Sequence, residues 1–197
     1  PVMFWAMYNT GLQAHQAIQA GCEPLDSWQT SVMRGLGVPF SASNILACLL
    51  HGALYYLPVY LVTLAVGGAW EVLFAAVRKH EISEGFLVTS ALYPLILPAT
   101  IPLWQTALGI SFGVVIGKEI FGGVGMNVFN PALMSRAFLY FAYPQQIVGN
   151  VWIAAKTNPD TYSGATWLQQ MKDYGMEGLL PGGEESVRGG VTWWEAF

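Results

Sequence analysis

The chain has 197 residues, of which 54% are hydrophobic and only 10% are charged. Soluble domains average about 25% charged residues, so this composition argues against a soluble globular domain and favours lipid as the surrounding solvent. The net charge is -4 and no basic run occurs, so no nucleic-acid partner is expected.

Neither end of the sequence resembles a natural terminus. The chain starts at Pro1, inside an apolar stretch without an initiator Met, and stops at Phe197 just after "VTWWEA". No secretory signal is visible before the apolar segments. We therefore expect a fragment of a longer membrane subunit.

The first clear membrane span covers residues 44–70. The preceding residues 2–19 are predicted to form the end of a membrane helix, and residues 21–43 a loop or an interfacial helix. Residues 44–70 carry no formal charge and exceed the roughly 20 residues that cross a bilayer. Pro58 should kink this helix, because proline removes a backbone donor.

A second span is predicted over residues 85–104. It contains Pro94, Pro98 and Pro102, each of which bends a helix and frees a carbonyl. In lipid such carbonyls need partners within the protein. This span should therefore pack inside a helical bundle.

Residues 105–117 and 130–144 are apolar but too short to cross a bilayer alone. They flank a Gly-rich break, which is typical of discontinuous half-helices whose backbone lines a cavity or site. Asn130 and Pro131 read as the N-cap and first residue of the second half-helix.

The predicted topology divides the chain into a transmembrane region, residues 1–144, and a polar loop, residues 145–197. Arg78 and Lys79 in a short loop indicate the cytoplasmic side. Following the spans outward then places the loop on the external face of the membrane, in a multi-pass protein.

Three charged residues near the break need partners if they lie at membrane depth. Lys118 and Glu119 could form a surface pair at a helix end or a charged group near an interior pathway. Arg136 requires a carboxylate such as Glu119, or an anionic ligand.

Two asparagines flank the break. Asn127 and Asn130 offer amide donors and acceptors. Helix capping explains Asn130 by itself; the alternative is that both bind the edge of a planar polar ligand.

Adjacent glycines interrupt the bulky side chains of the first span. Gly67 and Gly68 could permit close helix packing, or could leave a groove for a flat lipophilic headgroup beside Glu71.

Known catalytic and metal-binding patterns are absent from the sequence. Cys22 and Cys48 lack metal-ligand spacing, and His15, His51 and His80 are far apart. His51, on an apolar face, is predicted to be a hydrogen-bonded core histidine.

Long strings in this chain resemble one family. "MFWAMYNTGLQA", "GGAWEVLFAAVRKHEISEGFLVTS", "IPLWQTALGISFGVVIGKEIFGG", "NPALMSRAFLYFAYP" and "YSGAT" occur in the same order as in the B subunit of the Na⁺-translocating NADH:quinone reductase. The D subunit of the Rnf complex shares the S-G-A-T element, but the chain is more similar to the reductase subunit.

The resemblance implies an all-α membrane bundle with half-helices, forming one half of an inverted-repeat, urea-transporter-like fold. It implies that Thr166 carries FMN through a phosphoester bond, installed by a flavin transferase. It also implies a non-covalent riboflavin, for which Asn127 and Asn130 are our candidate ligands, while Gly67, Gly68 and Glu71 are our candidates for the quinone site.

The implied function is electron transfer in a redox-driven sodium pump. Electrons from NADH, oxidised in a partner subunit, would pass through flavins to ubiquinone and drive Na⁺ transport. Other subunits and lipid are the implied partners. The alternative is a flavin-free channel or permease of the urea-transporter type, which would explain the broken helices but not the S-G-A-T element.

Overall fold

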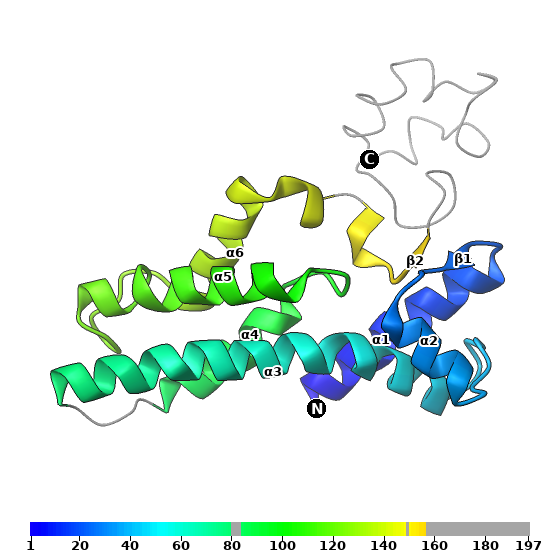
Figure 1. The fold of residues 1–197 in the computed structure, drawn as a ribbon, viewed down its shortest axis with the longest axis horizontal. Coiled ribbons are helices and arrows are strands. Elements are labelled where there is room, and N and C mark those ends of the chain that lie inside the picture. The colour runs from blue at the N-terminus through cyan, green and yellow to red at the C-terminus, as the bar shows by residue number, and fades with distance from the viewer. Residues whose placement is uncertain (80–83, 149, 157–197) are drawn as a thin grey trace, which may run out of the picture.

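The computed structural model describes residues 1–79, 84–148 and 150–156 (Figure 1). These ranges are mostly helical, which confirms the all-α class at that level. The helices are α1 (Val2–Gln19), α2 (Trp28–Gly35), α3 (Ile45–Arg78), α4 (Gly85–Leu95), α5 (Leu103–Val115) and α6 (Pro131–Ala142), with 3-10 turns η1 (Glu119–Phe121), η2 (Pro144–Gln146) and η3 (Asn150–Trp152). Strands β1 (Glu23–Pro24) and β2 (Ala155–Lys156) pair antiparallel.

The long helix α3 is the central helix of the fold: α1, α2, α4 and α5 contact it, and α6 packs on α4 and α5 (Figure 1). Its 34 residues span about 51 Å at ~1.5 Å per residue. Among the described residues it is the one helix long and apolar enough to cross a membrane. Asn44 caps it through Oδ1, and the helix continues past Pro58 and beyond the predicted end at residue 70 to Arg78.

The predicted span over residues 85–104 is wrong as a single helix. Helix α4 ends at Leu95 and α5 begins at Leu103, so the segment turns back on itself. Pro98 and Pro102 lie in this turn, where their missing N–H groups cannot continue a helical ladder. The turn is closed instead by short-range bonds, including one from the Ile101 amide to the Pro98 carbonyl (3.3 Å).

Two short helices occur where the sequence predicted the half-helices. Helices α5 and α6 pack closely on each other, and residues 116–130 join them through a Gly-rich hairpin. A Cβ on Gly113 would lie 1.9 Å from Ser135 Oγ and 2.4 Å from the Pro131 carbonyl oxygen. Only a residue without a side chain allows this approach, as at small-residue contacts in membrane bundles.

Helices α1 and α3 meet through a reciprocal backbone contact. A Cβ on Gly11 would lie 1.9 Å from the Cys48 carbonyl oxygen, and a Cβ on Gly52 would lie 1.7 Å from the Met7 carbonyl oxygen. The absence of a side chain at each glycine therefore lets the backbone of the opposite helix approach closely.

Two packed regions share α3. Around its C-terminal half, α4, α5 and α6 form a core that includes Tyr93, Ile110 and Leu139. Around its N-terminal half, α1 and the residues next to β2 pack in smaller clusters that include Ala17 and Ile153.

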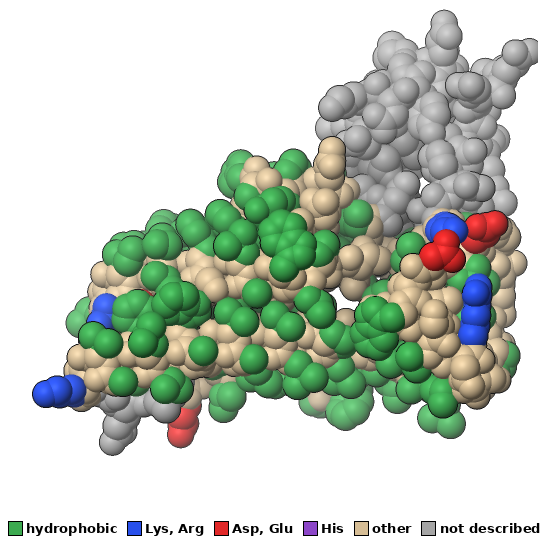
Figure 2. Space-filling model, in the orientation of Figure 1, with side chains coloured by type: hydrophobic (Ala, Val, Ile, Leu, Met, Phe, Trp, Pro, Cys, Tyr) green, Lys and Arg blue, Asp and Glu red, His purple; other side chains and the backbone are tan. Residues whose placement is uncertain are grey.

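The outer surface of the helices is apolar. Figure 2 shows hydrophobic side chains spread along the molecule, with the charged ones gathered towards its two ends. On α3 alone, Leu61, Val72 and Val77 are more than half exposed. Such a surface is favourable against lipid or another apolar protein rather than against water.

Candidate functional site

Four charged side chains meet where the C-terminal end of α3 lies beside the chain that follows α5. The ammonium group of Lys118 donates to Glu71 Oε1 and lies 3.4 Å from Glu119 Oε1. Arg78 Nη1 donates to Glu119 Oε2 at 3.0 Å, and Nη2 donates to the Glu119 carbonyl. The signs alternate along this charge network, Glu71–Lys118–Glu119–Arg78, so its formal charge is zero.

Burial distinguishes this network from an ordinary surface pair. The side chains of Glu71, Lys118 and Glu119 are 2%, 6% and 1% exposed, whereas that of Arg78 is 32% exposed. The surface-pair interpretation of Lys118 and Glu119 is therefore wrong. Removing Lys118 would leave the buried Glu71 carboxylate without a partner, and an unpaired buried charge typically costs about 3–5 kcal/mol.

Arg136 does not pair with Glu119, which was one of the two partners predicted for it. Its guanidinium lies 5.5 Å from the ring centroid of Trp152, a cation–π contact between α6 and η3. Glu119 is occupied instead by Arg78 and Lys118. The sequence missed this because Arg78 is closer in space but 41 residues earlier in the chain.

The two adjacent glycines of α3 differ in their surroundings. A Cβ on Gly67 would lie 2.6 Å from the ring of Phe86 and 3.1 Å from Ile110 Cγ1, so close packing occupies that face. A Cβ on Gly68 would meet only Phe86, at 3.8 Å, which is an ordinary contact. Open space beside the glycines is therefore confined to Gly68, one helical turn before Glu71.

The Gly-rich hairpin begins at the charge network. Gly122, Gly123 and Gly125 have φ values of 114°, 97° and 87°, in the left-handed region that favours glycine. The amide of Gly122 donates to the Glu119 carbonyl, which also accepts from Arg78. Contacts from α3 therefore fix the start of the hairpin.

In each of the two hairpin asparagines, only one of the two polar atoms of the side-chain amide forms a hydrogen bond. Asn130 Oδ1 accepts from the Ala132 and Leu133 amides (2.9 and 3.4 Å), which confirms its role as N-cap. Asn127 Nδ2 donates to the Phe129 carbonyl at 2.8 Å. Within the described residues, Asn130 Nδ2 and Asn127 Oδ1 make no hydrogen bond, so the NH₂ group of Asn130 and the carbonyl oxygen of Asn127 remain available.

A buried histidine pair lies between α1 and α3. The rings of His15 and His51 stack with centroids 5.0 Å apart, and Cys48 Sγ lies 3.3 Å from His15 Nδ1. His51 is buried as predicted, but neither of its ring nitrogens has a partner, so the prediction of a hydrogen-bonded histidine is wrong. In the part of the chain that the structure describes, no three His, Cys, Asp or Glu side chains form a metal-binding group. His80 lies outside this part.

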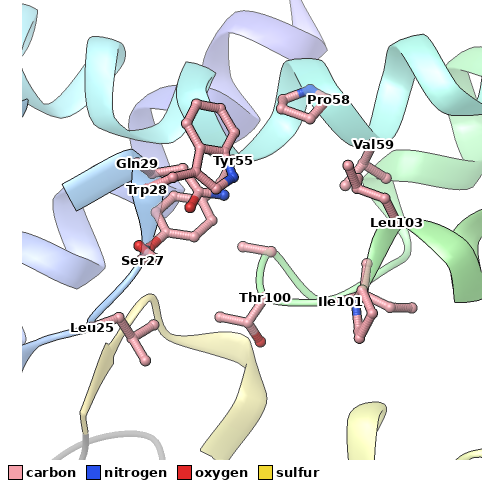
Figure 3. A pocket seen from close by; sticks show the side chains of 12 residues that line it. Leu25, Ser27, Trp28, Gln29, Tyr55, Pro58, Val59, Thr100, Ile101 and Leu103 are labelled. Carbon is pink, nitrogen blue, oxygen red and sulfur yellow. The ribbon is translucent and has the colours of Figure 1, made fainter. Parts of the chain in front are cut away.

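A cavity of about 310 Å³ opens between α2, α3 and the turn from α4 to α5 (Figure 3). Leu25 and Ser27 lie on one side, with Pro58, Val59 and Leu103 opposite. Tyr55 reaches across to Ser27, and their hydroxyl oxygens are 2.9 Å apart. The sequence did not reveal this cavity, because its walls come from three segments distant in the chain.

The strand pair β1–β2 lies next to this cavity and is joined by ion pairs from Lys156. Lys156 on β2 is 2.7 Å from Asp26 Oδ2 and 3.4 Å from Glu23 Oε2. The hydrogen bond from Lys156 and its charge lower the pKa of the Asp26 carboxyl. The bonds to Asp26 and Glu23 raise the pKa of Lys156.

The predicted flavin attachment site, Thr166, lies outside the described residues. The same is true of the rest of the S-G-A-T element and of most of the predicted loop 145–197. Its assignment stays a prediction.

Comparison with known proteins places the whole chain in one group. Residues 1–197 match the family described as "NQR2, RnfD, RnfE family". Similar relatives include the B subunit of the Na(+)-translocating NADH-quinone reductase of Chromohalobacter salexigens, 56% identical over 198 residues, and that of Pseudoalteromonas atlantica, 53% identical over 201 residues. The same subunit of Klebsiella pneumoniae is 54% identical over 208 residues.

These matches cover all of this chain but only 45%, 47% and 48% of the three relatives. The chain therefore spans about half the length of the curated relatives it matches.

Proposed function

The chain belongs to the NQR2, RnfD, RnfE family, and from this membership we propose that it is part of the B subunit of a sodium-translocating NADH:quinone reductase. Electrons taken from NADH in a partner subunit pass through flavins to ubiquinone, and this passage drives Na⁺ across the membrane. The observation that carries the proposal is identity of 53–56% to such subunits over the full chain. The chain supplies membrane helices and an anchor for a flavin.

The proposed fold is one half of an inverted repeat of the urea-transporter type, in a bacterial inner membrane. The short helices α5 and α6 around a Gly-rich hairpin support it, because broken helices of this kind occur in such repeats. Residues 145–197 would face the periplasm.

Thiol labelling of intact cells tests this orientation. A membrane-impermeant reagent should label Lys156→Cys, which lies in the region around the N-terminal half of α3. It should spare Lys79→Cys, because Lys79 follows the C-terminal end of that helix. The native Cys22 and Cys48 are buried and provide a low background. Labelling of Lys79→Cys alone would reverse the orientation.

Thr166 is proposed to carry FMN through a phosphoester bond. Its hydroxyl lies in "YSGAT", where small neighbours leave space for a phosphate and for the transferase. The intact mass of subunits made with and without the transferase should differ by one FMN minus one water. Thr166→Ala should lose this mass, whereas Ser163→Ala, the matched neighbouring hydroxyl, should keep it. A flavin retained by Thr166→Ala would refute the assignment.

Asn127 and Asn130 are proposed to hold riboflavin at the hairpin. The fit rests on the unused Asn127 acceptor and Asn130 donor, because the pyrimidine edge of a flavin carries both an N–H group and carbonyl groups. When bound, a flavin there would supply an electron-transfer step. The two amides would bind and orient its edge.

Substitutions separate ligand binding from helix capping. Asn130→Asp keeps a cap of similar quality but removes the amide donor, so riboflavin content should fall while α6 stays intact. Asn127→Leu should weaken binding by about 1–3 kcal/mol, because a ligand group is left unpaired. Riboflavin is measured after extraction from the purified complex. Unchanged content in the single and double variants would eliminate the site.

The quinone headgroup is proposed to pass beside Gly68, with Glu71 nearby. Close packing fills the face at Gly67, so Gly68 is the position where a flat ring could approach α3. Glu71 accepts from Lys118 and could exchange a proton with a reduced quinone. Gly67 would then act through packing against Phe86.

The kinetics of Gly68→Val test this path. The variant should raise the KM for quinone and leave NADH oxidation by an artificial acceptor unchanged. Poor assembly with normal quinone kinetics in the surviving complex would show that Gly68 serves packing alone.

A flavin-free channel or permease is the competing function, favoured by the same half-helices. The denatured protein separates the two proposals. Yellow fluorescence that remains with the band on a gel supports the reductase, and its absence from protein made with the transferase supports the permease.

A further inference from the structure

We propose that Arg78 positions the flavin site at the Gly-rich hairpin by joining the start of the hairpin to the end of α3. This inference rests on the proposed function, because the riboflavin beside Asn127 and Asn130 is the group that the hairpin would carry. Arg78 acts on that site through Glu119, so it is a positioning residue rather than a ligand. Neither the family match nor the names of the relatives assigns a role to it.

The first observation is that the Arg78 guanidinium binds Glu119 at two points. Nη1 donates to the side-chain Oε2 at 3.0 Å, and Nη2 donates to the backbone carbonyl. The centroid of the Phe74 ring lies 5.4 Å from the guanidinium carbon, so a cation–π contact holds one face of the group. A planar guanidinium presents several donors in a fixed geometry, whereas the ammonium of lysine is a point charge on a flexible stem. The two-point contact therefore requires arginine.

The second observation is that the anchored carbonyl starts the backbone hydrogen bonds of the hairpin. The Glu119 carbonyl also accepts from the Gly122 amide at 3.1 Å. The Met126 amide then donates to the Gly123 carbonyl at 3.3 Å, one residue before Asn127. A displacement of the Glu119 backbone would therefore be passed along the hairpin to the proposed flavin ligands.

The third observation is that the rest of the hairpin has little else to fix its position. Val124, Met126 and Val128 are 58%, 70% and 71% exposed. In the described part of the chain, Arg78 is the one residue outside 117–130 that forms a hydrogen bond with residues 119–129. The position of the hairpin on α3 therefore depends on this contact.

The fourth observation separates this role from the neutralisation of buried charge. The Glu119 side chain is 1% exposed, and Lys118 Nζ lies 3.4 Å from its Oε1. Replacing Arg78 with lysine leaves the formal charge of the network at zero, because both side chains carry one positive charge. What the replacement removes is the simultaneous bond to the Glu119 carbonyl. Arg78→Lys therefore addresses the position of the hairpin rather than its charge balance.

Hydrogen exchange and riboflavin release in the purified complex test the proposal. Arg34→Lys is the matched control for Arg78→Lys, because both arginines lie in the last turn of a helix. The Arg34 side chain makes no hydrogen bond within the described residues. Both variants are also made together with Asn127→Leu and Asn130→Asp, a pair that should lack riboflavin. Deuterium uptake is compared between a peptide covering residues 119–126 and one covering α5, and riboflavin release is followed after dilution.

Arg78→Lys should raise the deuterium uptake of residues 119–126 and leave that of α5 unchanged. Riboflavin release should be about tenfold faster, the change expected when one charge-assisted hydrogen bond no longer holds the site. The riboflavin that remains should have a lower midpoint potential, because a less well placed Asn130 amide stabilises the reduced ring less. In the asparagine double variant the uptake should rise equally, and Arg34→Lys should change none of these quantities.

Unchanged uptake over residues 119–126 would overturn the proposal, and so would a parallel rise in α5, since that result describes a general loosening of the bundle. Greater uptake with normal riboflavin release and a normal midpoint potential would also overturn it. The asparagine double variant keeps the two levels apart. Riboflavin retained by that variant refutes the flavin site and this inference with it, whereas riboflavin lost from it but held normally by Arg78→Lys refutes the role of Arg78 alone.

Discussion

The contact between α1 and α3 should be intolerant of a single methyl group. A Cβ added at Gly52 would lie 1.7 Å from the Met7 carbonyl oxygen, whereas ordinary carbon–oxygen contacts begin near 3.3 Å. The two backbones must therefore separate by roughly 1.5 Å at the crossing. A side chain could rotate away, but a helical carbonyl cannot move without its helix.

The expected magnitude follows from two opposing effects. Overpacking costs about 1–3 kcal/mol, and a clash with backbone belongs at the upper end of that range. Alanine in a helix gains about 1 kcal/mol over glycine. Gly52→Ala should therefore destabilise the α1–α3 contact by about 2 kcal/mol, which raises the population of its opened form about 30-fold.

The native Cys48 reports this opening, because it is fully buried on α3 beside α1. The reaction of Cys48 with N-ethylmaleimide in the purified complex should accelerate by about the same 30-fold factor, provided that opening limits access. Gly35→Ala is the control, since nothing lies within 4 Å of its added Cβ. It should leave the labelling rate unchanged.

A double variant gives a sharper test of the same geometry. Gly11→Ala alone should resemble Gly52→Ala, because its Cβ would lie 1.9 Å from the Cys48 carbonyl oxygen. The pair should cost much less than the sum of the two, since one separation of the helices relieves both clashes. Additive effects, or a wild-type labelling rate in either single variant, would refute the backbone-contact explanation.

Two further predictions concern charged groups. Lys118→Met should destabilise the complex by about 3–5 kcal/mol, because it leaves the buried Glu71 carboxylate without its cation, whereas Glu119 keeps Arg78. Adding Glu71→Gln to Lys118→Met should recover part of the decrease in the midpoint temperature of thermal inactivation. An unchanged midpoint would argue against a coupled Glu71–Lys118 pair. The Asp26–Lys156 contact should protect the β1–β2 amides from hydrogen exchange more in wild type than in Asp26→Asn. Because the folded pKa of Asp26 is lowered, this protection is complete above its unfolded value of about 3.9 and is lost as pH falls through the folded one. A difference that persists at pH 2 would contradict this assignment.

Local chemistry in the sequence was enough to place several elements of the fold. Asn130 and Pro131 begin α6 as predicted, because a capping side chain and a preset φ angle act within one turn of helix. The charge-free segment 44–70 marks the first part of the one described helix suited to crossing a membrane, Ile45–Arg78. The family was also readable directly, since long strings identify it without any knowledge of contacts.

The three-proline span shows the limit of such local reasoning. Prolines bend or end a helix, and composition does not say which. Pro94 lies inside α4, whereas Pro98 and Pro102 occupy the turn before α5. The difference depends on how α4 and α5 pack on α3 and α6, which no window of sequence contains.

Only the tertiary structure decided which distant side chains meet. Glu71 and Lys118 are 47 residues apart, and His15 and His51 stack across two helices. Gly67 and Gly68 are equivalent in the sequence, yet Phe86 fills the space beside Gly67 and leaves Gly68 partly exposed. Hydrophobic periodicity and capping are properties of neighbours along the chain, whereas ion pairs, ring stacks and cavities depend on helix packing, which brings together residues that the sequence separates.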